Sequence, residues 1–255
     1  MGKPVGAGAV LLLAAVLGGC AGAGSSEGGL SGEMIDSSLM AAATNAESAG
    51  DPRTAAAHYS TLHRRHPSNP RYAVRLARML RLAGENQQAL AFLEGFRERE
   101  KRTPEFLIEL GKCYLAADRL NLAAHSLSEA IQAAPESWEA HSTLGVVHDY
   151  QGRHADALKA YEAALKVSPN NPAVLNNLAL SLAVSGDLSA AIATLEKAND
   201  QPKASPQVRQ NLALLLAIKG DAAAAERFAR KDLPPEVVRN NLRFFRALAD
   251  SVKAY

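Results

Sequence analysis

A regular spacing of about 34 residues recurs along most of this chain. The series has six positions, and glycine occupies five of them: Gly50, Gly84, Gly152, Gly186 and Gly220. Asp118 occupies the third position in the series. An alanine follows each position by five residues: Ala55, Ala89, Ala123, Ala157, Ala191 and Ala225. A small residue precedes each position by seven: Ala43, Ala77, Gly111, Gly145, Ala179 and Ala213. Even in a chain with 50 alanines among 255 residues, six alanines at one chosen register arise by chance with a probability on the order of 10⁻⁴. One structural unit is therefore predicted to be stacked several times.

The pattern resembles the tetratricopeptide repeat, in which about 34 residues form two antiparallel helices. The small residue of the first helix and the alanine of the second let two backbones approach closely. The glycine, with its freedom at positive φ, ends the first helix. Proline closes three of the repeats and breaks the second helix, at Pro67, Pro135 and Pro169. The resemblance implies an all-α superhelical solenoid with six repeats: residues 36–69, 70–103, 104–137, 138–171, 172–205 and 206–239.

The first twenty residues have the composition of an export signal. Lys3 precedes an apolar run from Val10 to Leu17, and this run is too short for a bilayer-spanning helix of ~20 apolar residues. The sequence that ends the run, Leu17-Gly18-Gly19-Cys20, resembles the lipobox of bacterial lipoproteins. That resemblance implies removal of residues 1–19 as a signal peptide and acylation of Cys20. The alternative is an ordinary secreted protein with a chance cysteine.

Residues 20–35 are rich in Gly, Ser and Ala and are predicted to form a flexible tether after the lipidated cysteine. No Asp follows the cysteine directly. Resemblance to the sorting rule of Gram-negative lipoproteins therefore implies a lipid anchor in the outer membrane, with the repeats facing the periplasm.

The end of the chain departs from the repeat. The sequence "KDLPPEVVRNNLRFFRALADSV" has a double proline followed by an apolar stripe at helical spacing: Val238, Leu242, Phe245, Leu248 and Val252. Residues 236–255 are predicted to be a capping helix that covers the last apolar surface of the stack. The last repeat, the Leu-Pro-Pro turn and the Asn-rich helix resemble the TadD-like lipoproteins of Flp (tight adherence) pilus assembly. This resemblance implies a pilotin-like helper that acts near the pilus secretin.

Two other functions stay open at this point. One is a pilotin or outer-membrane assembly lipoprotein of another system, and the other is a scaffold for cell-wall enzymes. A net charge of +2 disfavours nucleic-acid binding. Only Cys113 remains beside Cys20, so an intramolecular disulfide is not expected in the processed chain.

The sequence does not indicate an enzyme. It lacks the H-E-x-x-H and phosphate-binding glycine motifs. The histidines that could suggest a metal site are His58, His63, His66, His141 and His148. None of them belongs to a recognised ligand motif, so structural roles are expected and no metal or cofactor is predicted.

Function is therefore expected on the inner wall of the solenoid. In tetratricopeptide-repeat proteins the first helix of each repeat lines this wall, through residues at about its second, fifth, ninth, twelfth and thirteenth positions. The second repeat carries eight Lys/Arg and four Asp/Glu, and the third carries two and five. The groove is predicted to bind a protein, basic at its start and apolar further along; the alternative is that the arginines only solvate a surface. The predicted groove residues are Arg71, Val74, Arg78, Arg81, Leu82, Ile108, Lys112, Leu115, Val146, Tyr150, Asn176 and Leu180. The Lys/Asn clamp that some relatives use for chaperone C-termini is absent.

Overall fold

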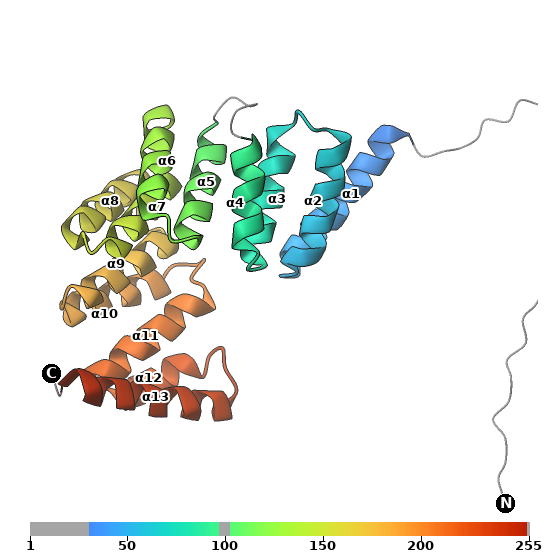
Figure 1. The fold of residues 1–255 in the computed structure, drawn as a ribbon. Coiled ribbons are helices and arrows are strands. Elements are labelled where there is room, and N and C mark those ends of the chain that lie inside the picture. Colours follow the sequence, from blue (N-terminus) through green and yellow to red (C-terminus); the bar gives the residue numbers. More distant parts are fainter. Residues whose placement is uncertain (1–30, 97–102, 254–255) are drawn as a thin grey trace, which may run out of the picture.

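The computed structural model describes residues 31–96 and 103–253, with side chains as far as Phe245. Within this part the chain forms thirteen helices, and consecutive helices pack as antiparallel pairs into a curved stack (Figure 1). The helices are α1 (Gly32–Ser48), α2 (Pro52–Arg65), α3 (Pro70–Leu82), α4 (Asn86–Phe96), α5 (Pro104–Ala116), α6 (Leu120–Ala133), α7 (Trp138–Tyr150), α8 (His154–Val167), α9 (Pro172–Val184), α10 (Leu188–Asn199), α11 (Pro206–Lys219), α12 (Ala222–Ala229) and α13 (Pro235–Lys253). The predicted all-α solenoid is confirmed.

The starts of the first helices follow the repeat as closely as the glycines do. A polar side chain caps α3, α5, α7, α9 and α11 by accepting a backbone N–H two or three residues ahead: Asn69, Thr103, Ser137, Asn171 and Ser205. Such caps satisfy N–H groups that a helix start leaves without partners. The repeat boundaries are therefore fixed by caps as well as by turns.

The turns inside the helix pairs have the predicted left-handed residue. The backbone angle φ lies between +71° and +101° at the five repeat glycines and is +58° at Asp118. Glycine adopts these angles without steric cost, and aspartate tolerates them because its short side chain can bond locally. Asp118 thus replaces glycine at a position where few other residues would fit.

The predicted close approach of the two helices in each pair is present throughout. All six alanines of the second helices are fully buried, and so are the four alanines at the small positions of the first helices. The other two small positions are Gly111 and Gly145. A Cβ atom built on Gly145 would lie 2.6 Å from Cε1 of Tyr161, which is closer than carbon atoms approach. The repeat thus needs a small residue there for steric reasons.

We expect Gly145→Ala to lower the free energy of unfolding by about 1–3 kcal/mol, because the added methyl group overpacks the α7–α8 contact. The Tyr161 ring cannot easily move aside, since it is 1% exposed and its hydroxyl donates to Asp149 Oδ2 at 2.8 Å. Urea unfolding followed by fluorescence of Trp138, the single tryptophan, reports on this repeat.

Gly95→Ala is the matched control for that variant. Gly95 lies in α4, and a Cβ atom there would have no neighbour within 4 Å. Removing a glycine from an open helical position should leave stability unchanged or raise it by up to about 1 kcal/mol. Equal losses in both variants would contradict the close α7–α8 contact.

The first helices of successive pairs form the inner wall of the stack. From α3 onward each first helix contacts the next first helix, whereas each second helix contacts only the first helices on either side of it. This pattern within the described residues curves the stack so that α3, α5, α7, α9 and α11 lie inside.

The two ends of the stack differ from the regular repeat. Helix α1 begins at Gly32, inside the stretch predicted as a tether to residue 35, because Ser31 accepts the Met34 N–H and starts the helix one turn early. The predicted signal peptide and Cys20 lie outside the described residues. None of the helices within the described part is long and apolar enough to cross a bilayer.

At the other end, α12 has only eight residues before the Leu-Pro-Pro turn, and α13 then packs along α11 and α12. Val238 and Leu242 are buried and Phe245 packs against them, as predicted for the cap. The side chains of Leu248 and Val252 lie outside the described part. Arg209 holds the turn through two hydrogen bonds to Asp232, of 2.7 and 2.5 Å, which lower the pKa of Asp232.

Candidate functional site

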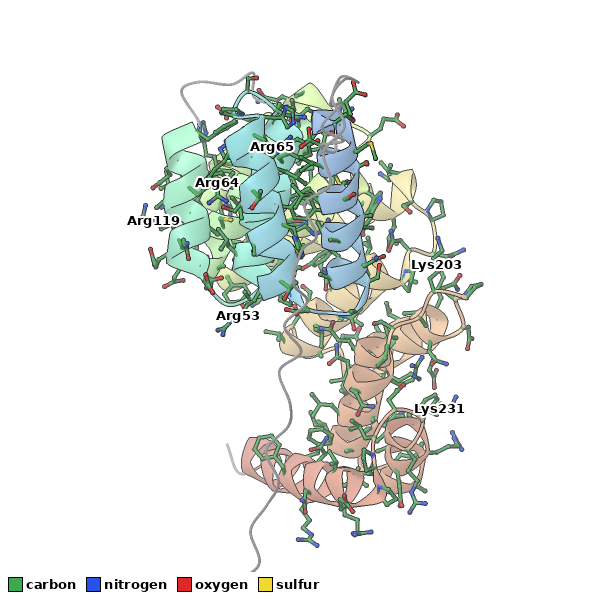
Figure 2. The ribbon with its side chains drawn as sticks, turned by 90° about the vertical axis from the view of Figure 1, so that its right-hand side faces the viewer. Arg53, Arg64, Arg65, Arg119, Lys203 and Lys231 are labelled. Atoms are coloured by element: carbon green, nitrogen blue, oxygen red, sulfur yellow. The ribbon has the colours of Figure 1, made fainter. Side chains whose placement is uncertain are left out.

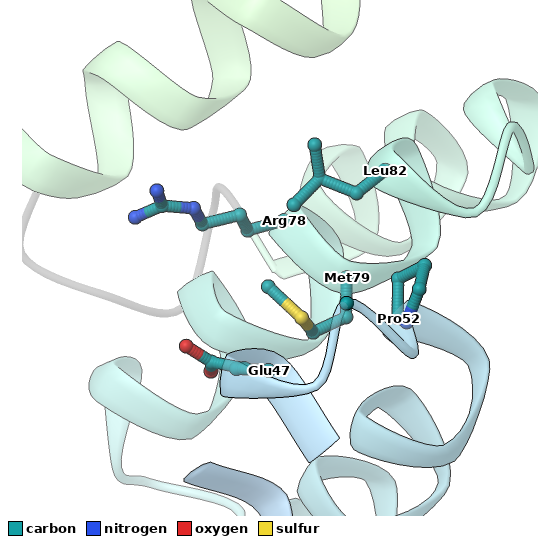
Figure 3. A pocket seen from close by; sticks show the side chains of 6 residues that line it. Glu47, Pro52, Arg78, Met79 and Leu82 are labelled. Atoms are coloured by element: carbon teal, nitrogen blue, oxygen red, sulfur yellow. The ribbon is translucent and has the colours of Figure 1, made fainter. Parts of the chain in front are cut away.

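Three cavities lie beside the first helices of the inner wall. A cavity of about 360 Å³ lies between the end of α1 and α3 and is lined by Glu47, Pro52, Arg78, Met79 and Leu82 (Figure 3). A second, of about 520 Å³, lies at the starts of α3 and α5, beside Arg71 and Val74. The third and largest, of about 580 Å³, extends over α5 and α7 to α9. We refer to the surface of the first helices that bears these three cavities as the inner groove.

The largest cavity brings together five of the residues predicted from sequence. Its lining includes Arg81, Lys112, Leu115, Val146 and Tyr150. The lining residues that the sequence analysis missed are Ala116, Asp118, Thr143 and Asn177. Tyr150 is 69% exposed at the end of α7, so an aromatic ring stands free at the edge of the cavity. An exposed aromatic side chain beside a hollow is a common anchor for a protein partner.

Two predicted groove residues do not reach the groove surface. Ile108 is 6% exposed and packs with Leu107, Ala130 and Ala140. Asn176 is 5% exposed and accepts a hydrogen bond from Asn211 Nδ2 of α11 at 2.8 Å. Both stand at the fifth position of their helix, where their side chains face neighbouring helices, whereas Val74 at the fifth position of α3 lines the second cavity. Leu180 is half-buried and lines none of the three cavities.

Arg81 is part of a buried ion pair and not a free cation. Its Nε donates to Glu109 Oε1 at 2.7 Å, and the Glu109 residue is 4% exposed. Burial disfavours the charged form of Arg81, but the hydrogen bond and charge of Glu109 outweigh it and raise the pKa of Arg81. The pair joins α3 to α5 across two repeats, so we assign it mainly to the architecture of the wall.

Lys112 is bound in the same way. Its ammonium group pairs with Glu139 on α7, one repeat further along. Arg75 likewise pairs with Glu47 of the preceding repeat at 2.9 Å. Arg71 and Arg78, by contrast, are exposed and have no ion-pair partner among the described residues. These two arginines are therefore the cations that the groove can offer to a partner.

Polar side chains cross the wall beyond the largest cavity. Asn177 Nδ2 donates to Ser142 Oγ at 3.3 Å, and Asn211 Nδ2 donates to Asn176 Oδ1. Asn176 and Asn177 are also linked, at 3.4 Å. These bonds connect α7, α9 and α11. Asn177 is the member of this network that lines the largest cavity, whereas Ser142 and Asn176 are buried beneath the groove surface, and Val184 is exposed at the end of α9.

The side chains that could suggest chemistry have structural neighbours. These neighbours are Asp36 for His66, Phe92 and Phe96 for His63, the carbonyl oxygen of Pro135 for His141, and Gln151 for His148. Within residues 31–96 and 103–253, no three His, Cys, Asp or Glu side chains are grouped so that they could hold a metal ion. Burial, followed by the charge of Glu109, raises the pKa of Cys113 to about 12. Its thiol is thus protonated at neutral pH, which makes it a poor nucleophile.

Comparison with known proteins places the chain among repeat proteins. It is 33% identical over 110 residues to the probable UDP-N-acetylglucosamine–peptide N-acetylglucosaminyltransferase SPINDLY of Solanum lycopersicum, and the match covers 43% of this chain and 12% of that protein. The chain thus matches only a small part of that relative.

Two solved structures share the fold. TTC0263, a thermophilic tetratricopeptide-repeat protein of Thermus thermophilus, superposes with a TM-score of 0.66 at 21% identity, covering 71% of this chain and 98% of that one. Pseudomonas aeruginosa pilF superposes with a TM-score of 0.61 at 17% identity, covering 83% and 97%.

Residues 12–233 match the family model described as the cilia and flagella-associated protein 70 C-terminal domain. That range includes nearly all of the helix pairs and their repeats. The fold implies protein partners, because stacked helix pairs present an extended concave surface. By its repeat spacing, its helix pairs and this match, the chain belongs to the tetratricopeptide-repeat family of the cilia and flagella-associated protein 70 C-terminal domain.

Proposed function

We propose that this chain is a lipoprotein on the periplasmic side of the outer membrane that assists assembly of a Flp (tight adherence) pilus. It acts without catalysis, by binding a segment of a protein partner in the inner groove, and we take the pilus secretin as that partner. The lipobox that ends at Cys20 supports the anchor. The Leu-Pro-Pro turn and Asn-rich last helix, which resemble those of TadD-like lipoproteins, support the pilus system.

The observation that carries the proposal is the composition of the inner groove. Arg71 and Arg78 have no ion-pair partner in the described part, and exposed Leu82 lies one turn beyond Arg78 on α3 (Figure 3). Exposed Tyr150 stands further along, at the largest cavity. A fitting partner segment has acidic residues at one end and apolar side chains along the rest. The apolar contacts supply most of the affinity, and the charges fix the direction.

A binding role also agrees with the chemistry of the buried polar groups. Cys113 is the one free cysteine in the described part, and its raised pKa keeps it protonated. Glu109 is buried but is held by Arg81, so its charge is already compensated within the protein. These groups support a wall that presents a surface and leaves its partner chemically unchanged.

We expect Arg71→Glu/Arg78→Glu to slow association with the purified pilus secretin by about tenfold at low salt, because attraction of an acidic segment becomes repulsion. The difference should shrink when salt reduces the Debye length below ~8 Å. Both side chains are exposed, so the variant should fold normally. In cells, secretin multimers in the outer membrane should decrease.

Arg64→Glu/Lys166→Glu is the matched control, since it makes the same charge change at two exposed cations of α2 and α8, second helices outside the groove (Figure 2 shows Arg64). Like Arg71 and Arg78, these two residues have no ion-pair partner in the described part. The control should associate at the wild-type rate and leave secretin multimers intact. If the groove variant also behaves as wild type in both measurements, then Arg71 and Arg78 only solvate the surface and the proposed partner is wrong.

A further inference from the structure

The C-terminal end of the stack carries a local excess of positive charge. Residues 222–246 contain six Lys/Arg and three Asp/Glu, whereas the net charge of all 255 residues is +2. Two of those three acids are already paired, Glu226 with Arg230 at 2.7 Å and Asp232 with Arg209. The remaining acid is Glu236. The local excess of positive charge is therefore available to something outside the chain.

Four cations at this end have no ion-pair partner among the described residues: Arg227, Lys231, Arg239 and Arg243. Arg227 and Lys231 approach the Phe228 ring, at 5.4 and 5.2 Å from its centroid, in a cation–π arrangement. Arg239 and Arg243 are exposed on α13, one helical turn apart. In Figure 2, Lys231 projects away from the stack at this end.

Apolar side chains are exposed on the same helix as the arginines. Phe244 is 65% exposed and Val237 is 37% exposed, and their separation of two helical turns places both on one face of α13. The opposite face is occupied, because Val238 and Leu242 are buried against α11 and α12. Helix α13 lies across the end of the stack, so its outer face has no neighbouring helix in the described part (Figure 1).

We propose that the outer face of α13 docks on an anionic lipid surface. An exposed phenylalanine beside arginines on the outer side of one helix is the pattern of helices that lie in the membrane interface, where the ring enters the headgroup region and the cations meet lipid phosphates. An acidic protein would satisfy the arginines but would not by itself account for an exposed ring beside them. Phe244, Arg239 and Arg243 are the contact residues of this docking face.

The docking face gains strength from the proposed lipid anchor, and to that extent the inference rests on the proposed function. One phenylalanine and a few cations bind a bilayer weakly on their own. A tether that holds the same chain at the membrane raises the effective concentration of the face, so weak binding becomes sufficient. The stack would then be held at both ends, with α1 beside the tether and α13 on the lipid.

The test uses a chain that starts at residue 21, which retains every described residue but has no lipid. A failure of the docking proposal is therefore distinguishable from a failure of the proposed lipid anchor at Cys20. We expect this chain to sediment with vesicles of phosphatidylcholine containing phosphatidylglycerol, less with phosphatidylcholine alone, and less at high salt. Arg239→Gln/Arg243→Gln should weaken binding about 25-fold, at roughly fivefold for each cation.

Phe244→Ser should weaken binding by about tenfold, because the ring no longer enters the interface. Phe244→Trp should restore it, with an emission shift to shorter wavelength when vesicles are added. Both variants should keep the wild-type circular dichroism, since the side chain is mostly exposed. Arg53→Gln/Arg64→Gln, which removes two charges from α2, should bind as the wild type does.

Three results would overturn the proposal. The first is absence of binding to the anionic vesicles, and the second is an equal loss in the α2 control, which would indicate an effect of total charge. The third is binding to polyglutamate as tight as to vesicles and unaffected by Phe244→Ser, which would assign the face to an acidic protein instead.

Discussion

Replacing Arg81 with methionine is expected to lower the free energy of unfolding by about 3–5 kcal/mol, the usual cost of removing one partner of a buried ion pair. The cost arises at Glu109, which is 4% exposed. Its Oε1 accepts a hydrogen bond from Arg81 Nε at 2.7 Å. Without that guanidinium, a buried carboxylate remains in the wall and has lost its ion-pair partner. Urea unfolding followed by circular dichroism measures the loss.

The matched control is the double variant Arg81→Met/Glu109→Leu. Replacing both charges with apolar groups of similar volume leaves no buried charge uncompensated, so most of the lost stability should return. A double variant as unstable as the single one would mean that packing, and not charge, makes Arg81 important.

This pair also explains why the groove is tested at Arg71 and Arg78. By their positions in the repeat, Arg81 and Lys112 are predicted to be cations of the groove as well. A charge reversal at Arg81 would place two carboxylates together in the wall, and any lost binding would then reflect lost folding. Arg71 and Arg78 have no such partner in the described part, so their reversal tests the surface alone.

The fold was predictable because its requirements are steric and local. A positive φ at the turn restricts a position to glycine or to a residue such as Asp118, and the α7–α8 contact restricts Gly145 in a similar way. Both restrictions recur with every repeat, so the sequence displays them several times. The first helix start was missed because Ser31, which lies outside the regular series of caps, begins α1 one turn early.

The groove was less predictable because it depends on which helix faces which. Ile108, Asn176 and Val74 all stand at the fifth position of a first helix, yet neighbouring helices bury Ile108 and Asn176 and leave Val74 beside a cavity. The ion pairs that join adjacent first helices do leave a signal in the sequence. In each pair, the acidic and the basic residue are separated by nearly the same number of residues. The pairs are Arg75 and Glu47, Arg81 and Glu109, and Lys112 and Glu139. A separation somewhat shorter than one repeat places opposite charges on adjacent first helices.

Replacing Cys20 with alanine is expected to remove the protein from the outer membrane almost completely. The lipobox resemblance implies two or three acyl chains on the processed N-terminus. A single chain, at ~0.8 kcal/mol per buried CH₂, gives only marginal binding, whereas several chains hold a protein stably. The variant should remain unprocessed or become soluble in the periplasm. Separation of the membranes and the intact mass of the protein measure both effects.

Cys113→Ala provides the control for that result, because it removes the other cysteine of the chain, which is buried in α5. It should fractionate as the wild type does. In cells the Cys20→Ala variant should also reduce secretin multimers although its groove is intact, because a tether keeps the groove at a high effective concentration near a partner in the same membrane. A Cys20→Ala variant that still sediments with the outer membrane, or a wild-type protein without the acyl mass, would refute the anchor. If the variant is soluble and secretin multimers are normal, the anchor is real but the partner lies elsewhere.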